Sequence, residues 1–548
     1  MKQIIKNYSI EILLTTFALI FSTWLMWHTF SYENGSMLIA AKAWSDFASH
    51  IPLIRSFSLG NNFPPEYPIF PGEPIRYHFL FYLFVGLLEK IGLRIDWALN
   101  VPSVLSFTLL ILSIYLLAKF LFKSRAVAIL SVIFFLFNGS LSFVEFFKTH
   151  PISLLTPKEI FTNTEFPAFF PYIRSSLITG GFWNLNVFTN QRHLASALTF
   201  FLFLFLFIHK KTESKKFKLK HAMLCGIGLG LLPFWNGAVF VMAMVVLSSY
   251  SLFWGKKDFI RLCVLVLIGL CITFPQIFLI RGEGSKSSLE LIPGYLINSQ
   301  LSPQMFSKFW ILNLGLGLVL MPIGFLLTTR KNRRVFLSFG ALFIFANLFK
   351  MTPDIAANHK FFNLFITVGN MFSANAIILL LKRWPLFHIL LPLVALTLIL
   401  SGIIDFFAIK NDRLIEVIDY SKQPDANWIL KNTPRNSVFL NSSFIYHPAS
   451  LVGRKIFLGW PYFAWSAGYD TDTRFQEIKD VYVSSNKHDV CTFLRNKKID
   501  FIETQPRYSK EEFPISFSLF EKNFHLVYKN QISGLRIYNT KTSCNNVY

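Results

Sequence analysis

The sequence predicts an α-helical membrane protein that crosses the bilayer many times and carries a small α/β domain at its C-terminal end. Of the 548 residues, 53% are hydrophobic and only 15% are charged, whereas soluble domains have about a quarter of their residues charged. Phenylalanine alone occurs 63 times. A water-soluble core cannot hide so much phenylalanine, but lipid-facing helices accept it readily. The polar last part of the chain has a different pattern, described below.

Eleven apolar segments are candidates for membrane crossings, because a spanning helix needs about 20 mostly apolar residues. They are 10–30, 99–121, 126–143, 193–209, 222–234, 237–254, 260–280, 309–328, 335–349, 361–381 and 386–407. Lys2 and Lys6 precede the first segment, and no small-residue cleavage site follows it. We therefore expect a retained first helix with the N-terminus in the cytoplasm.

The formal net charge of +23 lies mainly in short loops between these segments. This is the distribution of cytoplasmic loops in membrane proteins, so we exclude nucleic acid as a partner. The loops expected in the cytoplasm are 123–125, 209–221, 256–261, 330–334 and 382–383.

The apolar stretch 79–92 would reverse this topology if it crossed the membrane, because loop 209–221 would then lie outside. We expect it to lie in the outer interface as an in-plane helix, or to dip in and return. About eleven crossings then place the C-terminus outside the cytoplasm.

Two domains follow: a transmembrane domain over 1–409, with large external loops 31–98 and 144–192, and an extracytoplasmic α/β domain over 410–548. Strand-like runs in the second domain alternate with helical stretches at 413–421 and 488–497. The predicted strands are 437–440, 455–458, 501–503, 525–528 and 535–538. Cys491 and Cys544 can pair there if the domain faces an oxidising compartment.

Asp46 is the first candidate catalytic residue, because it lies between Trp44 and Phe47 soon after the first crossing. Partial desolvation raises the pKa of a carboxylate and suits it to general-base chemistry. His50 lies four residues on and shares its face if the segment is helical. The alternative is that Asp46 caps or solvates an interfacial helix.

A proline-rich stretch over 61–78 contains Glu73, Arg76 and His78, and its prolines force an extended loop. Because this loop leads into the predicted in-plane segment, these side chains should lie at headgroup height. Arg76 and His78 then either bind a phosphate or anchor the interface in the ordinary way.

His359 and Lys360 lie at the outer end of the predicted crossing 361–381. Two potential cations at a helix N-terminus form an anion site to which the helix dipole contributes. A lysine on this side also departs from the positive-inside distribution, which favours a phosphate-binding role.

The tail segment 447–470 is dense in glycine, tryptophan and tyrosine and contains Arg454. It either covers an active cleft or forms a tightly turned domain loop. Loop 144–192, with its amides, aromatic residues and few charges, suits either sugar hydroxyls or an ordinary folded surface.

The layout resembles the GT-C superfamily of membrane glycosyltransferases, and within it the protein O-mannosyltransferase and aminoarabinose transferase group. The resemblance rests on the retained first helix, the early acid Asp46, the acid at Glu73-Pro74, Pro102-Ser103 in the next crossing and the basic turn 123–125. It covers roughly residues 1–210. The chain lacks the paired Asp-Glu and the His-Pro-Pro of the mannosyltransferases and the Trp-Trp-Asp of oligosaccharyltransferases. The acceptor of this chain should therefore not be taken from either group.

The resemblance implies a polyprenyl-phosphate-linked sugar donor at the outer face and an inverting transfer to an unknown lipid, glycan or protein acceptor. Asp46 and Glu73 would be the catalytic acids. His50, Arg76, His78, His359, Lys360 and Arg454 would bind substrate. Some GT-C enzymes use a divalent cation such as magnesium or manganese, and Asp46 with Glu73 offers at most a partial oxygen site.

The sequence leaves two other classes of protein open. A transporter or flippase usually places ionisable residues near the midplane of the bilayer, on broken helices in two matched halves of the chain. The predicted crossings contain few such residues. A non-catalytic protein of cell-envelope polysaccharide assembly would share the same hydropathy.

The predicted topology has a direct test. A tag after Glu213 should be cytoplasmic, because Glu213 lies in the basic loop 209–221. A tag at the C-terminus should be extracytoplasmic, because eleven crossings separate it from a cytoplasmic N-terminus. Labelling of single cysteines with an impermeant reagent on intact cells should modify only the second site. Permeabilised cells, in which both should react, provide the control, and outside labelling near residue 213 would contradict eleven crossings.

Overall fold

The computed structural model describes residues 2–138, 140–168, 177–180, 183, 185–281, 289–384, 387–505 and 513–544. The chain forms two compact units. The helical unit comprises Met1–Thr29, Asn100–Pro275 and Ser288–Arg413. The mixed unit comprises Phe30–Leu99, Gln276–Ser287 and Leu414–Tyr548. The predicted first external loop therefore belongs to the same unit as the polar tail.

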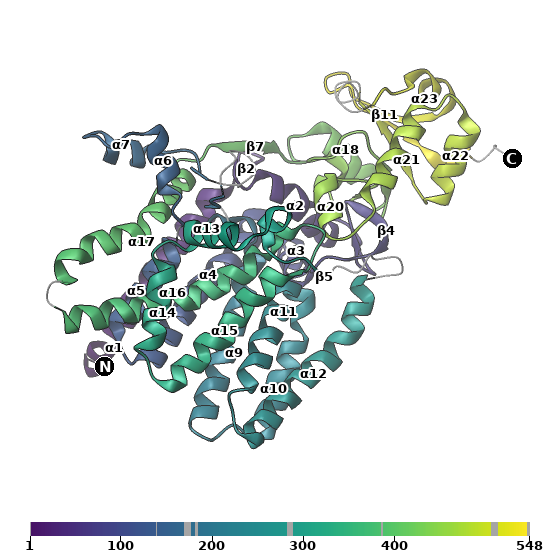
Figure 1. Cartoon of the computed structure of the whole chain (residues 1–548). Coiled ribbons are helices and arrows are strands. Elements are labelled where there is room, and N and C mark those ends of the chain that lie inside the picture. The colour runs from purple at the N-terminus through teal and green to yellow at the C-terminus, as the bar shows by residue number, and fades with distance from the viewer. Residues whose placement is uncertain are drawn as a thin grey trace. The chain divides into compact units, whose positions relative to one another are not determined.

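Long apolar helices dominate the helical unit, and a helix overlaps each of the eleven predicted segments (Figure 1). Their bounds are α1 (Lys2–Thr29), α4 (Ile95–Phe122), α5 (Arg125–Leu136), α9 (Arg192–Glu213), α10 (Leu219–Gly230), α11 (Leu232–Ser251), α12 (Lys256–Arg281), α13 (Pro303–Leu314), α14 (Gly317–Leu326), α15 (Arg330–Leu348), α16 (His359–Arg383) and α17 (Phe387–Lys410).

Among the described residues, seven helices are long and apolar enough to cross a membrane. They lie in α1, α4, α9, α11, α12, α16 and α17. Helices α13 and α14 form one further candidate, bent by 85° at their junction. The chain is thus a multi-pass membrane protein, and the count of eleven crossings stays a prediction.

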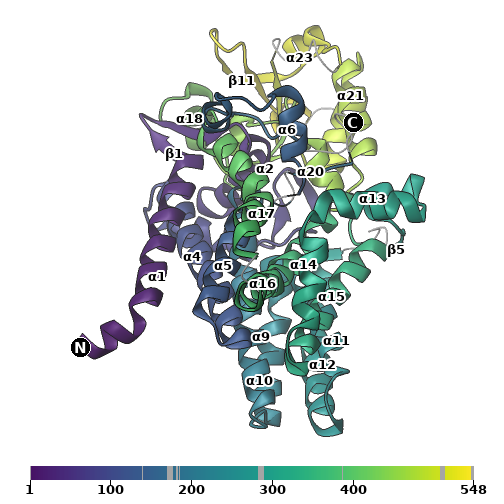
Figure 2. The ribbon, with the colours of Figure 1, turned by 60° about the vertical axis from the view of Figure 1, so that its left-hand side comes forward.

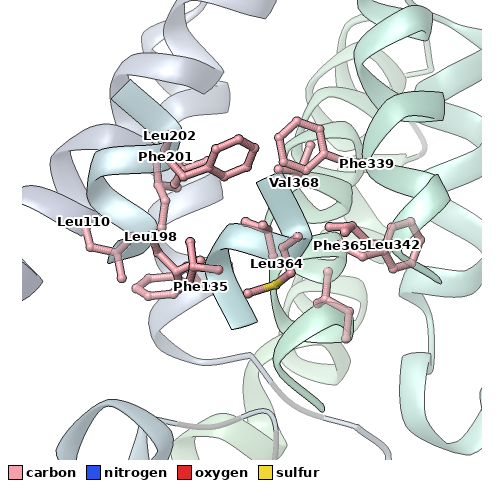
Figure 3. Packing of buried hydrophobic residues seen from close by; sticks show 14 of the residues in the cluster. Leu110, Phe135, Leu198, Phe201, Leu202, Phe339, Leu342, Leu364, Phe365 and Val368 are labelled. Carbon is pink, nitrogen blue, oxygen red and sulfur yellow. The ribbon is translucent and has the colours of Figure 1, made fainter. Parts of the chain in front are cut away.

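Aromatic and branched side chains fill the centre of the helical unit (Figure 3). Phe201 of α9 faces Phe339 of α15, with ring centroids 6.1 Å apart. Helix α16 contacts α5, α14 and α15 and lies among them in Figure 2. Helices α10 and α12 approach closely because Gly226 and Gly230 face the second helix. A Cβ on Gly226 would lie 2.7 Å from the Leu265 carbonyl oxygen.

The mixed unit begins with a β-hairpin of β1 (Phe30–Glu33) and β2 (Ser36–Ala40). Asn34 and Gly35 form its two-residue turn, and both have positive φ, as such turns require. Strand β7 (Leu414–Ile418) pairs antiparallel with β2. The helix predicted over 413–421 is therefore wrong, because pairing with a strand distant in the sequence overrides the local pattern.

The tail contains a five-stranded sheet in the order β11-β12-β10-β8-β9. The pairs β10–β8 and β8–β9 are parallel, and the pairs involving β12 are antiparallel. The strands are β8 (Val438–Leu440), β9 (Lys455–Ile456), β10 (Phe501–Thr504), β11 (His525–Lys529) and β12 (Arg536–Asn539), at the positions predicted. Helix α22 (Lys487–Asn496) also forms where a helix was predicted, and Cys491 is disulfide-bonded to Cys544.

Three elements of the first external loop build the candidate site. Helix α2 (Trp44–Ser58) follows the hairpin, strands β3 (Glu66–Tyr67) and β4 (Phe70–Pro74) pair within the proline-rich stretch, and α3 (Leu80–Lys90) follows them. Helix α3 occupies the apolar stretch expected to be helical, and its in-plane position stays a prediction.

Candidate functional site

Asp46 lies in the first turn of α2 and is half-buried. The N-terminus of a helix carries a partial positive charge that stabilises a carboxylate in its first turn. From Phe47 to Ser58 every residue of α2 is buried, so this helix is fixed within the mixed unit. Asp46 therefore stands at the exposed beginning of an otherwise enclosed helix.

Four tyrosines surround Asp46 closely enough for its charge to affect them. Burial is the main cause that raises the pKa of each phenol, and the Asp46 carboxylate raises it further in all four. They are Tyr67, Tyr77, Tyr82 and Tyr446. These phenols accordingly stay protonated and keep an O–H group that can donate a hydrogen bond.

Ring contacts join Tyr67, Tyr77 and Tyr82 into one aromatic surface, while Tyr446 packs on Trp44. Tyr67 stacks on Tyr77 at 5.8 Å and on Tyr469 at 5.9 Å between ring centroids. Tyr446 packs on Trp44 at 5.1 Å, and its hydroxyl donates to the Trp44 carbonyl oxygen at 2.5 Å. This hydrogen bond connects the tail to the first turn of α2.

His50 and His78 both lie on this aromatic surface. The buried ring of His50 stacks on Tyr82 with centroids 4.8 Å apart. His78 stacks on Tyr77 at 3.9 Å and is half-buried. The structure thus brings together Asp46, His50 and His78 around the same tyrosines.

Glu73 and Arg76 form an ion pair of 2.7 Å beside this surface. Arg474 lies 3.9 Å from the other Glu73 oxygen. Tyr469 accepts a hydrogen bond of 2.7 Å from the Arg76 backbone N–H and donates one of 3.0 Å to the Pro74 carbonyl oxygen. These contacts fasten the proline-rich loop to the tail, so Glu73 and Arg76 are already engaged with protein groups.

A buried ion cluster that was not predicted from the sequence lies at the other end of α2. Arg55 donates to both oxygens of Asp419, at 3.2 and 3.0 Å, and its Nε lies 2.7 Å from a Glu89 oxygen. Burial opposes the charge of Arg55, but the two carboxylates outweigh it and raise its pKa. The cluster joins α2, α3 and the segment after β7.

Arg454 is buried in the tail, and its guanidinium donates to the tail and to the end of α2. Its acceptors include the carbonyl oxygens of Leu59, Leu430 and Thr433 at 2.8–3.2 Å. Burial lowers its pKa to about 10. Because its guanidinium makes these bonds, Arg454 stabilises the turn after α19 (Pro448–Leu451). We do not include Arg454 among the proposed substrate-binding residues.

His359 and Lys360 begin α16 in the helical unit, whereas Asp46 belongs to the mixed unit. Asp354 caps the short helix before them, accepting from the Ala356 backbone N–H at 2.9 Å. Asn358 donates to the carbonyl oxygens of Ala346 and Phe349 at 3.0 and 2.6 Å. His359 is buried and Lys360 half-buried.

A divalent cation does not fit the acids present. In the part of the chain that the structure describes, no three His, Cys, Asp or Glu side chains gather as a metal-holding group. Glu73 faces two guanidinium groups, and Asp46 is surrounded by protonated tyrosines. We derive no chemical step through a metal.

No protein-family model matches the chain, and no curated protein matches it. Solved structures do. The aminoarabinose transferase ArnT from Cupriavidus metallidurans in the apo state superposes with a TM-score of 0.50 at 10% identity, over 97% of this chain and 98% of that one. The same enzyme bound to undecaprenyl phosphate gives 0.49 at 12% identity, over 98% and 99%.

The archaeal oligosaccharyltransferase AglB from Archaeoglobus fulgidus, in complex with an inhibitory peptide and a dolichol-phosphate, gives 0.47 at 12% identity, over 97% of this chain and 74% of that one. Both proteins are GT-C glycosyltransferases. The match to ArnT in the apo state shows that this chain has a similar fold.

The Arg55 cluster predicts a large effect of one substitution. Arg55→Met leaves Glu89 and Asp419 buried without their cation, which should cost about 3–5 kcal/mol of stability. Thermal unfolding of the purified protein in detergent measures it. Lys497→Met is the matched control, since its pair with Glu477 is exposed and should contribute at most about 1 kcal/mol.

Replacing both acids as well, in Arg55→Met/Glu89→Gln/Asp419→Asn, should restore part of the loss because no buried charge then remains. Equal unfolding temperatures for Arg55→Met and Lys497→Met would contradict the structural importance of the cluster.

Proposed function

We propose that the chain is a membrane glycosyltransferase that moves a sugar from a polyprenyl-phosphate-linked donor to an acceptor at the outer face of the membrane, with Asp46 as general base. The observation that carries the proposal is Asp46 itself. It lies at the start of a fixed helix, within an aromatic surface of protonated tyrosines, in a chain with the fold of GT-C enzymes.

The proposed reaction is a single displacement. Asp46 accepts the proton of the acceptor hydroxyl or amine as its heteroatom attacks the anomeric carbon. The bond from that carbon to the phosphate oxygen breaks, and polyprenyl phosphate leaves with the electron pair. A single displacement of this kind inverts the configuration at the anomeric carbon.

The tyrosines support such a role in two ways. Their O–H groups can donate to sugar hydroxyls and to the carboxylate, and their faces provide an aromatic platform for a sugar ring. His50 and His78 extend that platform through their stacking on Tyr82 and Tyr77.

Asp46 is a better candidate for the base than Glu73. Glu73 lies 2.7 Å from Arg76 and 3.9 Å from Arg474, so ion pairs within the protein already engage it. We therefore assign Glu73 to holding the proline-rich loop, and Arg76 and His78 to binding substrate.

The orientation has independent support from the disulfide between Cys491 and Cys544. Disulfides persist in oxidising compartments and are rare in the cytosol. An extracytoplasmic tail agrees with this pairing, with the predicted cytoplasmic N-terminus and with a donor used at the outer face.

Asp46→Asn should abolish transfer while the protein stays folded and inserted. The amide keeps the size of the side chain but cannot accept the proton, and general-base catalysis typically contributes about 10²–10⁴-fold. The measurement is consumption of a labelled polyprenyl-phosphate sugar by the purified protein.

Asp472→Asn is the matched control, because Asp472 also lies in the first turn of a helix, α21 (Thr471–Val483), but is exposed. It should leave the rate unchanged. If Asp46→Asn keeps activity within about threefold, less than one kcal/mol of barrier, Asp46 is a helix cap and the assignment is wrong.

Lys360→Ala should weaken donor binding, because we assign Lys360 and His359 to the phosphate leaving group. The substitution should change stability by only about 0.5 kcal/mol, as for most surface positions. Lys308→Ala is the control, an exposed lysine of the same unit in α13. Unchanged apparent donor affinity in both Lys360→Ala and His359→Ala would move the phosphate site to Arg76.

A further inference from the structure

An apolar arm extends from the helical unit and has no place in the proposed reaction. It comprises α6 (Phe143–Thr149), α7 (Thr156–Phe161) and the connection between them (Figure 1). Its tip exposes large apolar side chains: Leu154 is 100% exposed, Ile152 79% and Leu155 61%. Contiguous exposed apolar residues mark an interaction surface, because water contact with them is unfavourable.

The arm lies at one end of a candidate membrane span. Phe161 packs edge-on against Phe407 of α17, with ring centroids 4.9 Å apart. Asn411 donates to the carbonyl oxygens of Phe161 and Asn163, at 2.8 and 2.9 Å. The span in α17 ends at Lys410, so these contacts hold the arm at the level where the helix leaves the bilayer.

The first part of this span exposes apolar side chains. Along α17, Leu390, Leu393 and Leu396 are 53%, 62% and 47% exposed, as residues that face acyl chains would be. Phe161 itself is 58% exposed beside Phe407. An apolar tip at this height has the leaflet surface as its nearest apolar environment.

The charges of the arm do not favour a particular lipid headgroup. Glu145 and Lys148 form an ion pair of 2.8 Å, and Lys158 is followed directly by Glu159. Two basic and two acidic residues balance, so no electrostatic attraction to anionic lipid is expected. Binding would rest on apolar area alone.

We propose that residues 151–155 insert into the headgroup and acyl-chain boundary of the leaflet that meets the C-terminal end of α17. The occupant of this surface is the lipid bilayer, not a protein. The arm then anchors the outer end of α17 and the beginning of the 144–192 loop in the membrane surface.

The test uses the full chain in nanodiscs and a fluorescent bimane probe on a single cysteine. The background carries Cys225→Ser, Cys263→Ser and Cys271→Ser and keeps the disulfide. Leu154→Cys carries the probe. Ile532→Cys is the matched control, a 96% exposed apolar residue in the turn between β11 and β12.

Phospholipids brominated on the acyl chain should quench the probe at position 154 at least twofold more than the probe at position 532. Neutral phosphatidylcholine and anionic phosphatidylglycerol discs should give equal quenching. Quenching at position 154 as weak as at position 532 overturns the proposal.

Two further outcomes also overturn it. A blue-shifted probe at position 154 without quenching by brominated lipid would mean that a protein, such as a second copy, covers the tip. Quenching that appears only in anionic discs would mean attraction by headgroup charge instead of apolar insertion.

The Ile152→Asp variant should reduce the quenching at position 154 in neutral discs, since it adds a charge at the tip without touching the core.

Discussion

The ion cluster of Arg55, Glu89 and Asp419 holds together the three segments on which the candidate site depends. All three side chains are nearly inaccessible to water, and removing ions from water costs several kcal/mol each. Only close pairing offsets that cost, so α2, α3 and the segment that follows β7 must meet in one arrangement. Because Asp46 stands about two and a half turns before Arg55 on the same helix, the cluster also limits where the candidate base can lie.

A second constraint acts on the proline-rich loop. Its prolines leave few backbone donors for regular structure, and the tail supplies the missing partners: Arg474 donates to the Pro71 carbonyl oxygen at 2.8 Å, and Lys455 pairs with Glu66 at 2.6 Å. These bonds bring Tyr67 and Tyr77 beside Asp46. The acids of this loop hold it in place, since Glu66 pairs with Lys455 and Glu73 pairs with Arg76.

The sequence predicted what depends on local pattern. The five tail strands follow from short apolar runs, and the helices of the other unit follow from long ones. Strand β7 was missed because its conformation is set by pairing with β2, almost four hundred residues earlier. The Arg55 cluster and the aromatic surface from Tyr82 to Tyr469 were missed for the same reason. Their members are far apart in the chain, and a single sequence carries no signal of their proximity. The choice of Asp46 rested on its aromatic neighbours Trp44 and Phe47 and on the resemblance to the GT-C superfamily, and it stays a prediction.

Breaks in the apolar helices impose the last constraint, because a backbone group inside a membrane must find a partner within the protein. Helix α5 ends at Leu136 and α13 bends into α14, so carbonyl and N–H groups are released inside the helical unit. Asn313 donates to the carbonyl oxygen of Leu177 at 2.9 Å and accepts from the Thr179 N–H at 2.8 Å, while Asn370 donates to the Phe134 carbonyl oxygen at 3.4 Å. An amide both donates and accepts without the desolvation cost of a charge, which explains why asparagine serves at these breaks instead of lysine or aspartate.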